Sequence, residues 1–279
     1  MRLGIISNKR SGNGKPERVL KEFISYLDAK GIAWGIIDEQ ESGPLVNIDR
    51  LVIIGGDGTI NFTLNRFMPL TLPVAIIPAG TGNDFAAMHL GKVSMMRSFE
   101  IAIGECVKRV DAGLCNGKIF LNGIGIGFDG AVAGKLMQKK WFKGPSTYYA
   151  AVLAQILFFK SFQAKVSLGE TIIENSFLML CIANGTSYGG GFKVAPLAKA
   201  DDGLLDYMAV AGINPLKRLV NLPKIRSGTH LELPYVHYEL MENVCIQSDH
   251  LLPAHADGEY FESNIFEMSA LKGYLSLLS

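Results

Sequence analysis

Apolar and polar residues follow two different patterns along this chain of 279 residues. In the first 110 residues, short runs rich in Val and Ile alternate with segments of helical periodicity, which is typical of strands joined by helices. We expect strands at residues 3–7, 33–38, 51–54 and 74–77, and helices at 17–30 and 60–67. This alternation predicts an α/β domain with a parallel sheet, in which the loops that follow the strands lie at one edge.

After residue 110 the pattern changes to short strands separated by turns. We expect strands at 118–123, 164–168, 170–174, 177–183, 203–210 and 243–248, and helices near 131–138, 148–161 and 215–226. The pattern therefore predicts two domains: residues 1–110, and an antiparallel, β-sandwich-like domain of residues 111–271 with a few helices. We place the tail, residues 272–279, back on the first domain.

Composition excludes several classes of protein. A hydrophobic fraction of 48% with 19% charged residues is ordinary for a globular protein and excludes extensive disorder. The net charge of +1 gives no basis for binding nucleic acid. The four cysteines lack the paired spacing of a zinc site. We find no signal peptide, and the longest uncharged stretch, 144–159, is shorter than the ~20 residues of a membrane span, so we expect a cytoplasmic location.

The motif LVIIGGDGT at residues 51–59 is the most informative segment. Glycines allow a polyphosphate to approach the backbone N–H groups, and three of them surround one acid: Gly55, Gly56 and Gly58. That acid, Asp57, is a candidate to hold a divalent cation. The alternative is a tight turn, but three glycines around an Asp at the end of a strand favour a nucleotide site.

A second loop, PAGTGNDF at residues 78–85, has similar chemistry after the next strand. It offers glycines, the hydroxyl of Thr81 and the carboxylate of Asp84. We expect the two loops to face each other across one polyphosphate and its Mg²⁺, an ion that takes few carboxylates and keeps waters.

The segment NKRSGNGK at residues 8–15 follows the first strand, and Ser11 and Gly12 are candidates for phosphate contacts. It is not a Walker loop, because Pro16 stands where that motif has Ser or Thr. A structural turn is an equal alternative.

A formal GxGxxG occurs at Gly125, Gly127 and Gly130, but it lies in the β-rich region, so we interpret these glycines as close-packing positions.

Four motifs occur in one order along the chain: GGDGT, PAGTGNDF, GGGFKVAPLAKADDGLLD at residues 189–206, and ADGEY at 256–260. Together they resemble the diacylglycerol kinase catalytic family, in its soluble bacterial branch, which is related to sphingosine kinases and more distantly to NAD kinases. The resemblance covers nearly the whole chain. It implies an ATP-dependent lipid kinase that phosphorylates the hydroxyl of diacylglycerol or a similar lipid alcohol in a cleft between the domains.

The resemblance also implies roles for particular residues. The ATP contacts would be Asn8, Ser11, Gly12, Gly55, Gly56, Asp57, Gly58, Thr59, Asn61, Thr81 and Asp84. Asp57 and Asp84 would organise Mg²⁺, partly through water. Glu259 would accept the proton of the lipid hydroxyl, with Asp257 supporting it. A structural Mg²⁺ would bind the carboxylate of Asp202 and the backbone carbonyls of Lys199 and Leu204, for which a plain turn is the alternative.

Other features leave alternatives open. Asp111 stands near the domain junction, where it either influences the cleft electrostatically or forms a turn. Phe62, Lys9 and Asp38 or Glu39 depart from the family pattern around the nucleotide, which keeps a nucleotide-binding relative without catalysis as an alternative. A sphingoid-base kinase and an NAD-type kinase are the enzyme alternatives.

A lipid substrate implies transient peripheral contact with a membrane. The basic and aromatic cluster formed by Lys135, Lys139, Lys140, Trp141, Phe142 and Lys143 is a candidate for this contact. A solvated helix end is the alternative. The apolar residues of 148–159 are interpreted as core or as a pocket for lipid tails. The sequence leaves open whether the protein is a homodimer.

Overall fold

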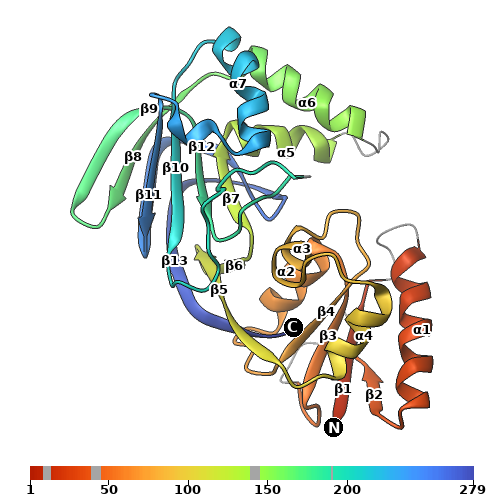
Figure 1. Cartoon of the computed structure of the whole chain (residues 1–279). Helices are drawn as coiled ribbons and strands as arrows, with labels where there is room; N and C mark the ends of the chain where they lie inside the picture. Colours follow the sequence, from red (N-terminus) through yellow and green to blue (C-terminus); the bar gives the residue numbers. More distant parts are fainter. Residues whose placement is uncertain (9–13, 39–44, 139–144, 190) are drawn as a thin grey trace. The chain divides into compact units, whose positions relative to one another are not determined.

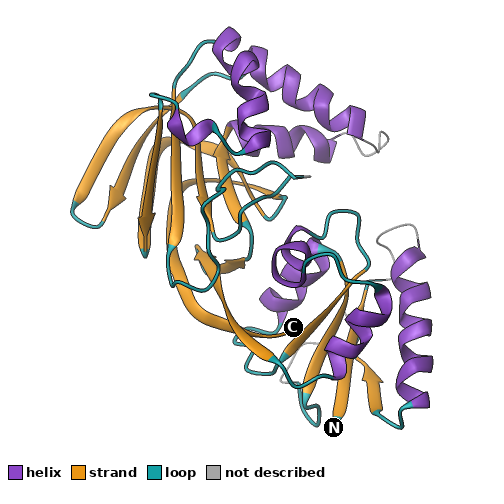
Figure 2. Ribbon diagram, viewed as in Figure 1, coloured by secondary structure: helices purple, strands orange, loops and turns teal. Residues whose placement is uncertain are grey.

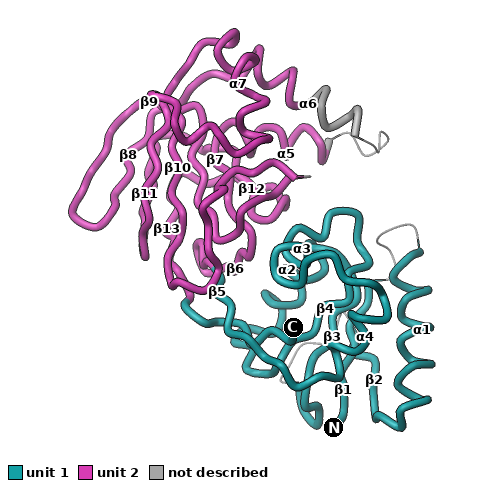
Figure 3. Tube along the Cα trace, viewed as in Figure 1, with its two compact units in different colours: residues 1–112, 272–279 teal, residues 113–271 magenta. Residues whose placement is uncertain are grey.

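The computed structural model describes residues 1–8, 14–38, 45–138, 145–189 and 191–279. It contains two compact units (Figure 3): unit 1 is Met1–Ala112 with Lys272–Ser279, and unit 2 is Gly113–Leu271. The boundary expected after residue 110 lies two residues before the observed one. The C-terminal tail belongs to unit 1, so the chain enters unit 2 once and returns once.

The centre of unit 1 is a sheet of parallel strands (Figure 1). Its order is β4-β3-β1-β2, and the end of β13 pairs in parallel with β4 at Leu277 and Val74. The strands are β1 (Arg2–Ser7), β2 (Ala33–Ile36), β3 (Arg50–Gly55), β4 (Val74–Pro78) and the last residues of β13 (Glu259–Leu278). Leu51 to Gly55 of β3 are all buried, which explains its continuous apolar run.

Helices cover this sheet (Figure 2). α1 (Lys15–Ala29) and α4 (Met95–Ile103) belong to one buried cluster with the strands, in which the rings of Phe23 and Phe99 lie 5.0 Å apart. α2 (Asp57–Arg66) follows β3, and α3 (Asp84–Leu90) begins six residues after Pro78, the last residue of β4. Because the apolar face of α1 is packed against the sheet, the loops after the strands are set on a rigid base.

The structure of unit 1 differs from the sequence expectation at its helices. The helix expected at 60–67 begins earlier, at Asp57, so the motif DGT forms its first turn. An acidic residue suits this position, because the helix dipole is positive at its N-terminus. The sequence pattern does not predict α3, because it treats PAGTGNDF as a loop although α3 begins at its Asp84. The expected helices also do not include α4.

Unit 2 is built from antiparallel strands. They are the end of β5 (Val107–Cys115), β6 (Lys118–Phe120), β7 (Gly123–Gly127), β8 (Phe162–Leu168), β9 (Thr171–Ala183), β10 (Leu205–Ala211), β11 (Val236–Met241), β12 (Asn243–Ala256) and most of β13. Their order is β11-β10-β9-β7-β12-β13, and β8 pairs with both β9 and β12. The two long strands β9 and β12 thus each pair with both β7 and β8 along different parts of their length.

The core of unit 2 is a continuous apolar cluster on the strands, with Tyr207 and Phe266 among its largest buried side chains. Three helices lie together at one end: α5 (Phe128–Gln138), α6 (Pro145–Phe158) and α7 (Pro215–Ser227), with a short 3₁₀ turn at His230–Glu232 (Figure 1). α5 contacts β7, β9 and β12.

The glycines of the formal GxGxxG pack closely in unit 2, as we interpreted them. A Cβ on Gly130 would lie 2.2 Å from the carbonyl oxygen of Pro253, and one on Gly127 would lie 2.1 Å from the ring of Phe162. A side chain at either position would therefore push α5 or β8 away from its neighbour. The dinucleotide interpretation, which we discounted, has no support in this packing.

Several strands of unit 2 differ from the expectation. The strand expected at 118–123 ends at Phe120, and the glycine-rich run Gly123–Gly127 is a separate, fully buried strand. The two strands expected at 170–174 and 177–183 are one strand, Thr171–Ala183, and β12 continues to Ala256. We also missed β11 and the long β13. The alternation of side chains along a strand does not reveal where a long strand changes its partner.

Candidate functional site

Three strand ends meet at one edge of the sheet in unit 1. β1, β3 and β4 are parallel neighbours, so their carboxyl ends lie side by side. β1 continues on one side to β2 and on the other to β3, and ligands bind open α/β sheets where the strand order reverses in this way. Asn8, half-buried, directly follows β1. Ser11 and Gly12, which we also expected at this edge, lie outside the described residues.

The loops after β3 and β4 are in direct contact. A Cβ built on Gly80 would lie only 2.4 Å from Cα of Gly56, so any side chain there would separate the loops. Asn83 fixes the second loop, because its Nδ2 donates to the carbonyl of Gly80 at 3.1 Å and its Oδ1 accepts from the N–H of Gly80 at 3.0 Å. The two glycine motifs therefore form one structure.

Asp57 joins these loops through its carboxylate. Its Oδ2 accepts the backbone N–H of Asp84 at 2.9 Å, and its Oδ1 accepts the backbone N–H of Phe85 at 3.0 Å. These N–H groups belong to the first turn of α3 and have no partner within that helix. Asp57 thus caps the neighbouring helix, while its remaining lone pairs can still bind water or a cation.

The N-terminus of α2 is arranged differently. Gly56 is its N-cap and provides no side-chain hydrogen bond. The first N–H groups of a helix attract anions, and Gly58, in this first turn, is exposed. Among the described loops of unit 1, the start of α2 therefore offers backbone donors for a phosphate, next to the carboxylate of Asp57.

The other residues expected around the nucleotide lie near this turn with different exposure. Thr59 is buried, and its Oγ1 lies 2.6 Å from the position that a Cβ on Gly55 would take. Asn61 is half-buried and its Oδ1 accepts from Nδ2 of Asn65 at 3.1 Å. Thr81 is exposed and Asp84, the first residue of α3, is half-buried.

A Mg²⁺–polyphosphate fits this set of groups. The start of α2 provides N–H donors, and Asp57 and Asp84 provide the carboxylate oxygens that Mg²⁺ prefers. Two of the departures from the family pattern are exposed: Phe62 on α2 is 51% exposed, and Asp38, which follows β2, is exposed as well. Lys9 and Glu39 lie outside the described residues.

In unit 2, the ADGEY motif forms the tight turn between β12 and β13. Asp257 and Gly258 both have left-handed backbone angles, with φ of 48° and 89°. The carboxylate of Asp257 accepts three backbone N–H groups, from Leu121 at 2.7 Å, Asn122 at 2.8 Å and Gly123 at 3.1 Å. Asp257 therefore attaches the turn to the segment between β6 and β7.

Glu259 is the first residue of β13, and its side chain is exposed. The turn beside it rests on His255, whose Nδ1 accepts the N–H of Gly258 at 3.3 Å. Burial lowers the pKa of His255 to about 4, so the ring is neutral near pH 7 and can act as this acceptor.

A buried polar cluster, which sequence reasoning missed, supports His255. The ring of Tyr188 packs edge-on against it, with centroids 5.0 Å apart. The Tyr188 hydroxyl donates to Oδ2 of Asp129 at 2.8 Å. Burial raises the pKa of Asp129 to about 6, and this hydrogen bond opposes the shift. Tyr188 is 67 positions from His255 and 59 positions from Asp129, with no regular spacing, so the sequence carries no signal for their contact.

The candidate cation loop before β10 contains an Asx turn. Oδ1 of Asp202 accepts the backbone N–H of Leu204 at 2.9 Å, Lys199 is exposed, and Leu204 is half-buried. This bond uses one of the two carboxylate oxygens. Within the described ranges, no group of three or more His, Cys, Asp or Glu could hold a metal ion. The geometry is compatible with both the turn and the ion.

Asp111 is a strand residue and does not form a turn, so that interpretation is wrong. It is 1% exposed, and its Oδ1 accepts the backbone N–H of Gly273 at 2.6 Å. The bond connects β5 to the returning end of β13 within unit 1.

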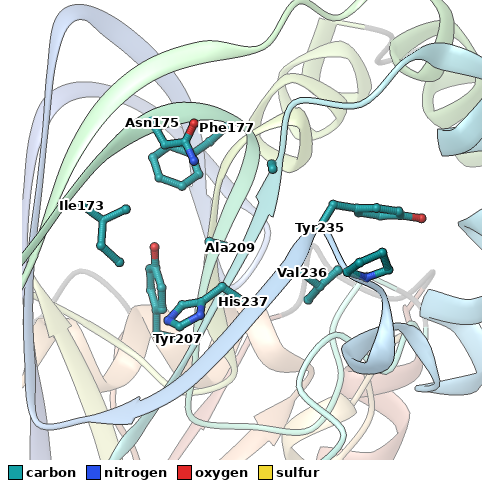
Figure 4. A pocket seen from close by; sticks show the side chains of 10 residues that line it. Ile173, Asn175, Phe177, Tyr207, Ala209, Tyr235, Val236 and His237 are labelled. Atoms are coloured by element: carbon teal, nitrogen blue, oxygen red, sulfur yellow. The ribbon is translucent and has the colours of Figure 1, made fainter.

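A pocket of about 340 Å³ opens in unit 2 between β9, β10 and β11 (Figure 4). It is lined by Phe177, Tyr207, Tyr235 and their neighbours, and by none of the residues expected from the sequence. The hydroxyls of Tyr207 and Tyr235 are buried without a hydrogen-bond partner among the described residues. None of the ADGEY residues, 256–260, lines this pocket.

Among the residues that the structure describes, none of the helices combines the length and the apolar composition that crossing a bilayer requires.

Family models and relatives match the chain along most of its length. The diacylglycerol kinase catalytic domain matches residues 2–115, and the YegS C-terminal NAD kinase beta sandwich-like domain matches residues 122–279. A diacylglycerol kinase of Mycobacterium tuberculosis (strain ATCC 25618 / H37Rv) is 30% identical over 289 residues, which cover 98% of this chain and 93% of the relative.

Solved structures share the fold. A diacylglycerol kinase from Bacillus anthracis str. Sterne has a TM-score of 0.73 at 23% identity, covering 99% of this chain and 96% of that one. An NAD kinase from Archaeoglobus fulgidus in complex with ATP has a TM-score of 0.57 at 14% identity, covering 100% and 94%. These structures establish the two-domain fold, and the family models with the Mycobacterium tuberculosis relative establish that the chain belongs to the diacylglycerol kinase catalytic family.

Proposed function

We propose that this protein is an ATP-dependent lipid kinase that transfers the γ-phosphoryl group to the hydroxyl of diacylglycerol or a similar lipid alcohol. The observation that carries the proposal is the pair of glycine loops joined by Asp57, beside the uncapped start of α2. Family membership supports it, since the Mycobacterium tuberculosis relative is named a diacylglycerol kinase. The Archaeoglobus fulgidus NAD kinase, which has the same fold, was solved with ATP.

In this proposal, the residues of unit 1 hold and orient the nucleotide. The N–H groups at the start of α2 would bind phosphate oxygens, and Asp57 and Asp84 would bind Mg²⁺, partly through water. When bound, the ion neutralises negative charge on the phosphates, which is the main requirement of phosphoryl transfer. Asp57 would then have two tasks, because the same carboxylate also fixes α3.

Glu259 is our candidate for the base. Its side chain is exposed and can therefore reach a substrate hydroxyl. The ordinary pKa of a carboxylate, ~4, is far below that of an alcohol, so the proton would leave as transfer proceeds and not before it. The reaction requires that Glu259 and the phosphate loops meet, which we propose occurs in a cleft between the two units.

Two further elements of the proposal concern positioning. Asp257 and His255 would hold the turn that carries Glu259, through the hydrogen bonds described above. Asp202, with the carbonyls of Lys199 and Leu204, would hold a structural Mg²⁺ that fixes the loop before β10.

A transfer assay tests the function. Purified full-length protein is incubated with Mg²⁺, γ-labelled ATP and, separately, diacylglycerol, sphingosine, another lipid alcohol and NAD. We expect label in the diacylglycerol product or in another lipid alcohol, and loss of transfer when a chelator removes Mg²⁺. Label in NAD alone would replace the lipid hypothesis by an NAD-type kinase. Nucleotide binding without transfer to any acceptor would instead support a regulator, for which the exposed Phe62 is the structural argument.

A further inference from the structure

α7 presents an apolar stripe to its outer side. At about 100° per residue, Leu216, Leu219, Val220 and Pro223 lie on one side of the helix. Leu216 is 70% exposed, Leu219 44% and Val220 65%, and Pro223 is exposed as well. A surface helix of a globular protein normally turns such a stripe toward the core. α7 therefore carries apolar side chains on its outer side as well as on the side that packs Leu222 and Ile225 against unit 2.

The opposite side of α7 attaches it to unit 2, so the exposed stripe is not the result of an undocked helix. Arg218 donates to the backbone carbonyls of Ile213 at 2.8 Å and Phe159 at 2.7 Å. Leu222 packs against the buried cluster that includes Val152 and Ile156 of α6. The inner side of the helix is therefore occupied by its own contacts, and the outer stripe needs another explanation.

α6, which contacts α7, also has exposed apolar side chains near its C-terminal end. Leu153, Leu157 and Phe158 are 46%, 56% and 79% exposed. α6 and α7 contact each other within unit 2, and Figure 1 shows them together at one end of its sheet. We call the exposed apolar side chains of these two helices the α6–α7 face: Leu153, Leu157, Phe158, Leu216, Leu219, Val220 and Pro223.

The charged side chains of α7 are all positive and α6 carries none, while the neighbouring 3₁₀ turn carries Glu232. Neither helix contains an Asp or a Glu. Lys217 and Lys224 lie on one side of the α7 stripe and Arg226 on the other, and all three are exposed. Lys160, also exposed, follows α6. An apolar stripe with cations on both sides is the composition of helices that lie in the interface of an anionic bilayer.

We infer that the α6–α7 face docks this protein onto an anionic phospholipid bilayer, with its apolar side chains inserted among the acyl chains and its cations at the headgroups. The inference rests on the proposed function, since a lipid acceptor is reached at a membrane. It also differs from the basic cluster that the sequence suggested, of which Lys135 lies on α5 and residues 139–143 lie outside the described residues.

Vesicle flotation tests the inference directly. Full-length protein is mixed with vesicles of phosphatidylcholine alone or with phosphatidylglycerol, and the bound fraction is measured. We expect binding to the anionic vesicles, and a fall of about tenfold or more in the partition coefficient for Leu219→Glu/Val220→Glu, because two apolar insertions are lost and two like charges added. Ile172→Glu/Leu251→Glu is the matched control, since these side chains are 58% and 63% exposed elsewhere in unit 2.

A charge variant and an activity measurement complete the test. Lys217→Glu/Lys224→Glu should lose the preference for phosphatidylglycerol. Transfer to diacylglycerol in vesicles should fall in both α7 variants, whereas transfer to a dispersed short-chain diacylglycerol should stay unchanged, which also shows that the variants are folded.

Binding that is equal in all variants would overturn the inference, as would a dimer that the α7 substitutions disrupt while vesicle binding is absent. Absence of transfer to either lipid by the parent protein would instead reject the proposed function, and flotation would still decide the docking.

Discussion

The glycine loops of unit 1 and the ADGEY turn of unit 2 use the same dipeptide in different backbones. Asp57 and Gly58 begin a helix, whereas Asp257 and Gly258 form a left-handed turn. In both places the carboxylate accepts backbone N–H groups of another segment, two at Asp57 and three at Asp257. The comparison shows that each acid first of all holds two segments together.

The two regions differ in how far structure and chemistry can be separated. In unit 1 the acid that joins the loops is also the candidate cation ligand, so both tasks depend on one side chain. In unit 2 the tasks are divided, because Asp257 holds the turn and the exposed Glu259 is the candidate base. Substitutions in unit 1 should therefore affect stability and activity together, and those in unit 2 should affect them separately.

The largest effect is expected for Asp57→Ala. The backbone N–H groups of Asp84 and Phe85 lose their acceptor, and the proposed cation loses a carboxylate. We expect kcat/KM for transfer to fall about a thousandfold or more, and the free energy of unfolding to fall by about 2 kcal/mol. Kinetics and denaturant unfolding measure the two effects. Asp249→Ala, at an exposed carboxylate of β12, is the control, and a loss of activity with unchanged stability would contradict the joint role.

Glu259→Gln should reduce kcat by about a hundredfold to a thousandfold, because a general base is removed. The side chain is exposed, so the free energy of unfolding should change by less than about 0.5 kcal/mol. The Kd for ATP, measured by calorimetry, should also be unchanged. Normal turnover in this variant would reject Glu259 as the base.

Asp257→Asn should act mainly on stability. An amide has one acceptor oxygen, and its NH₂ group would face a backbone N–H where the carboxylate now accepts. We expect the free energy of unfolding to fall by about 3 kcal/mol, measured by denaturant unfolding. The asparagine tolerates the left-handed φ, so backbone strain does not complicate the result. Asp249→Asn is the matched control, and an unchanged unfolding midpoint would show that the three hydrogen bonds do not hold the turn.

The smallest effect is a pH dependence that originates at His255. Burial lowers its pKa from 6.5 to about 4, so as the pH falls below 6.5 the unfolded chain takes up a proton that the folded protein does not. The stabilisation is complete above pH 6.5 and decreases toward pH 4, with about 2 kcal/mol lost between pH 7 and pH 5. His255→Asn keeps an acceptor for the N–H of Gly258 but does not titrate, so this part of the loss should disappear. Identical pH profiles of unfolding for the two proteins would contradict the assignment.

The sequence by itself determined the elements that are local in the chain. The Val and Ile runs identified β1, β3 and β4, because strands buried on both faces are continuous apolar segments. The glycine and acid motifs located both loops and the ADGEY turn. The start of α2 at Asp57 was missed, since glycines at a helix N-terminus look like a loop in a linear pattern.

Only the tertiary structure decided what these residues touch. The hydrogen bond from Asp84 of α3 to Asp57 joins residues 27 positions apart, and the one from Leu121 to Asp257 joins residues 136 positions apart. The spacing of these residues in the sequence does not predict either contact. The contacts of His255 with Tyr188, and the outward stripe of α7, arise in the same way. Periodicity shows that a helix has an apolar side, but the packing of its neighbours decides whether that side faces the core or the solvent.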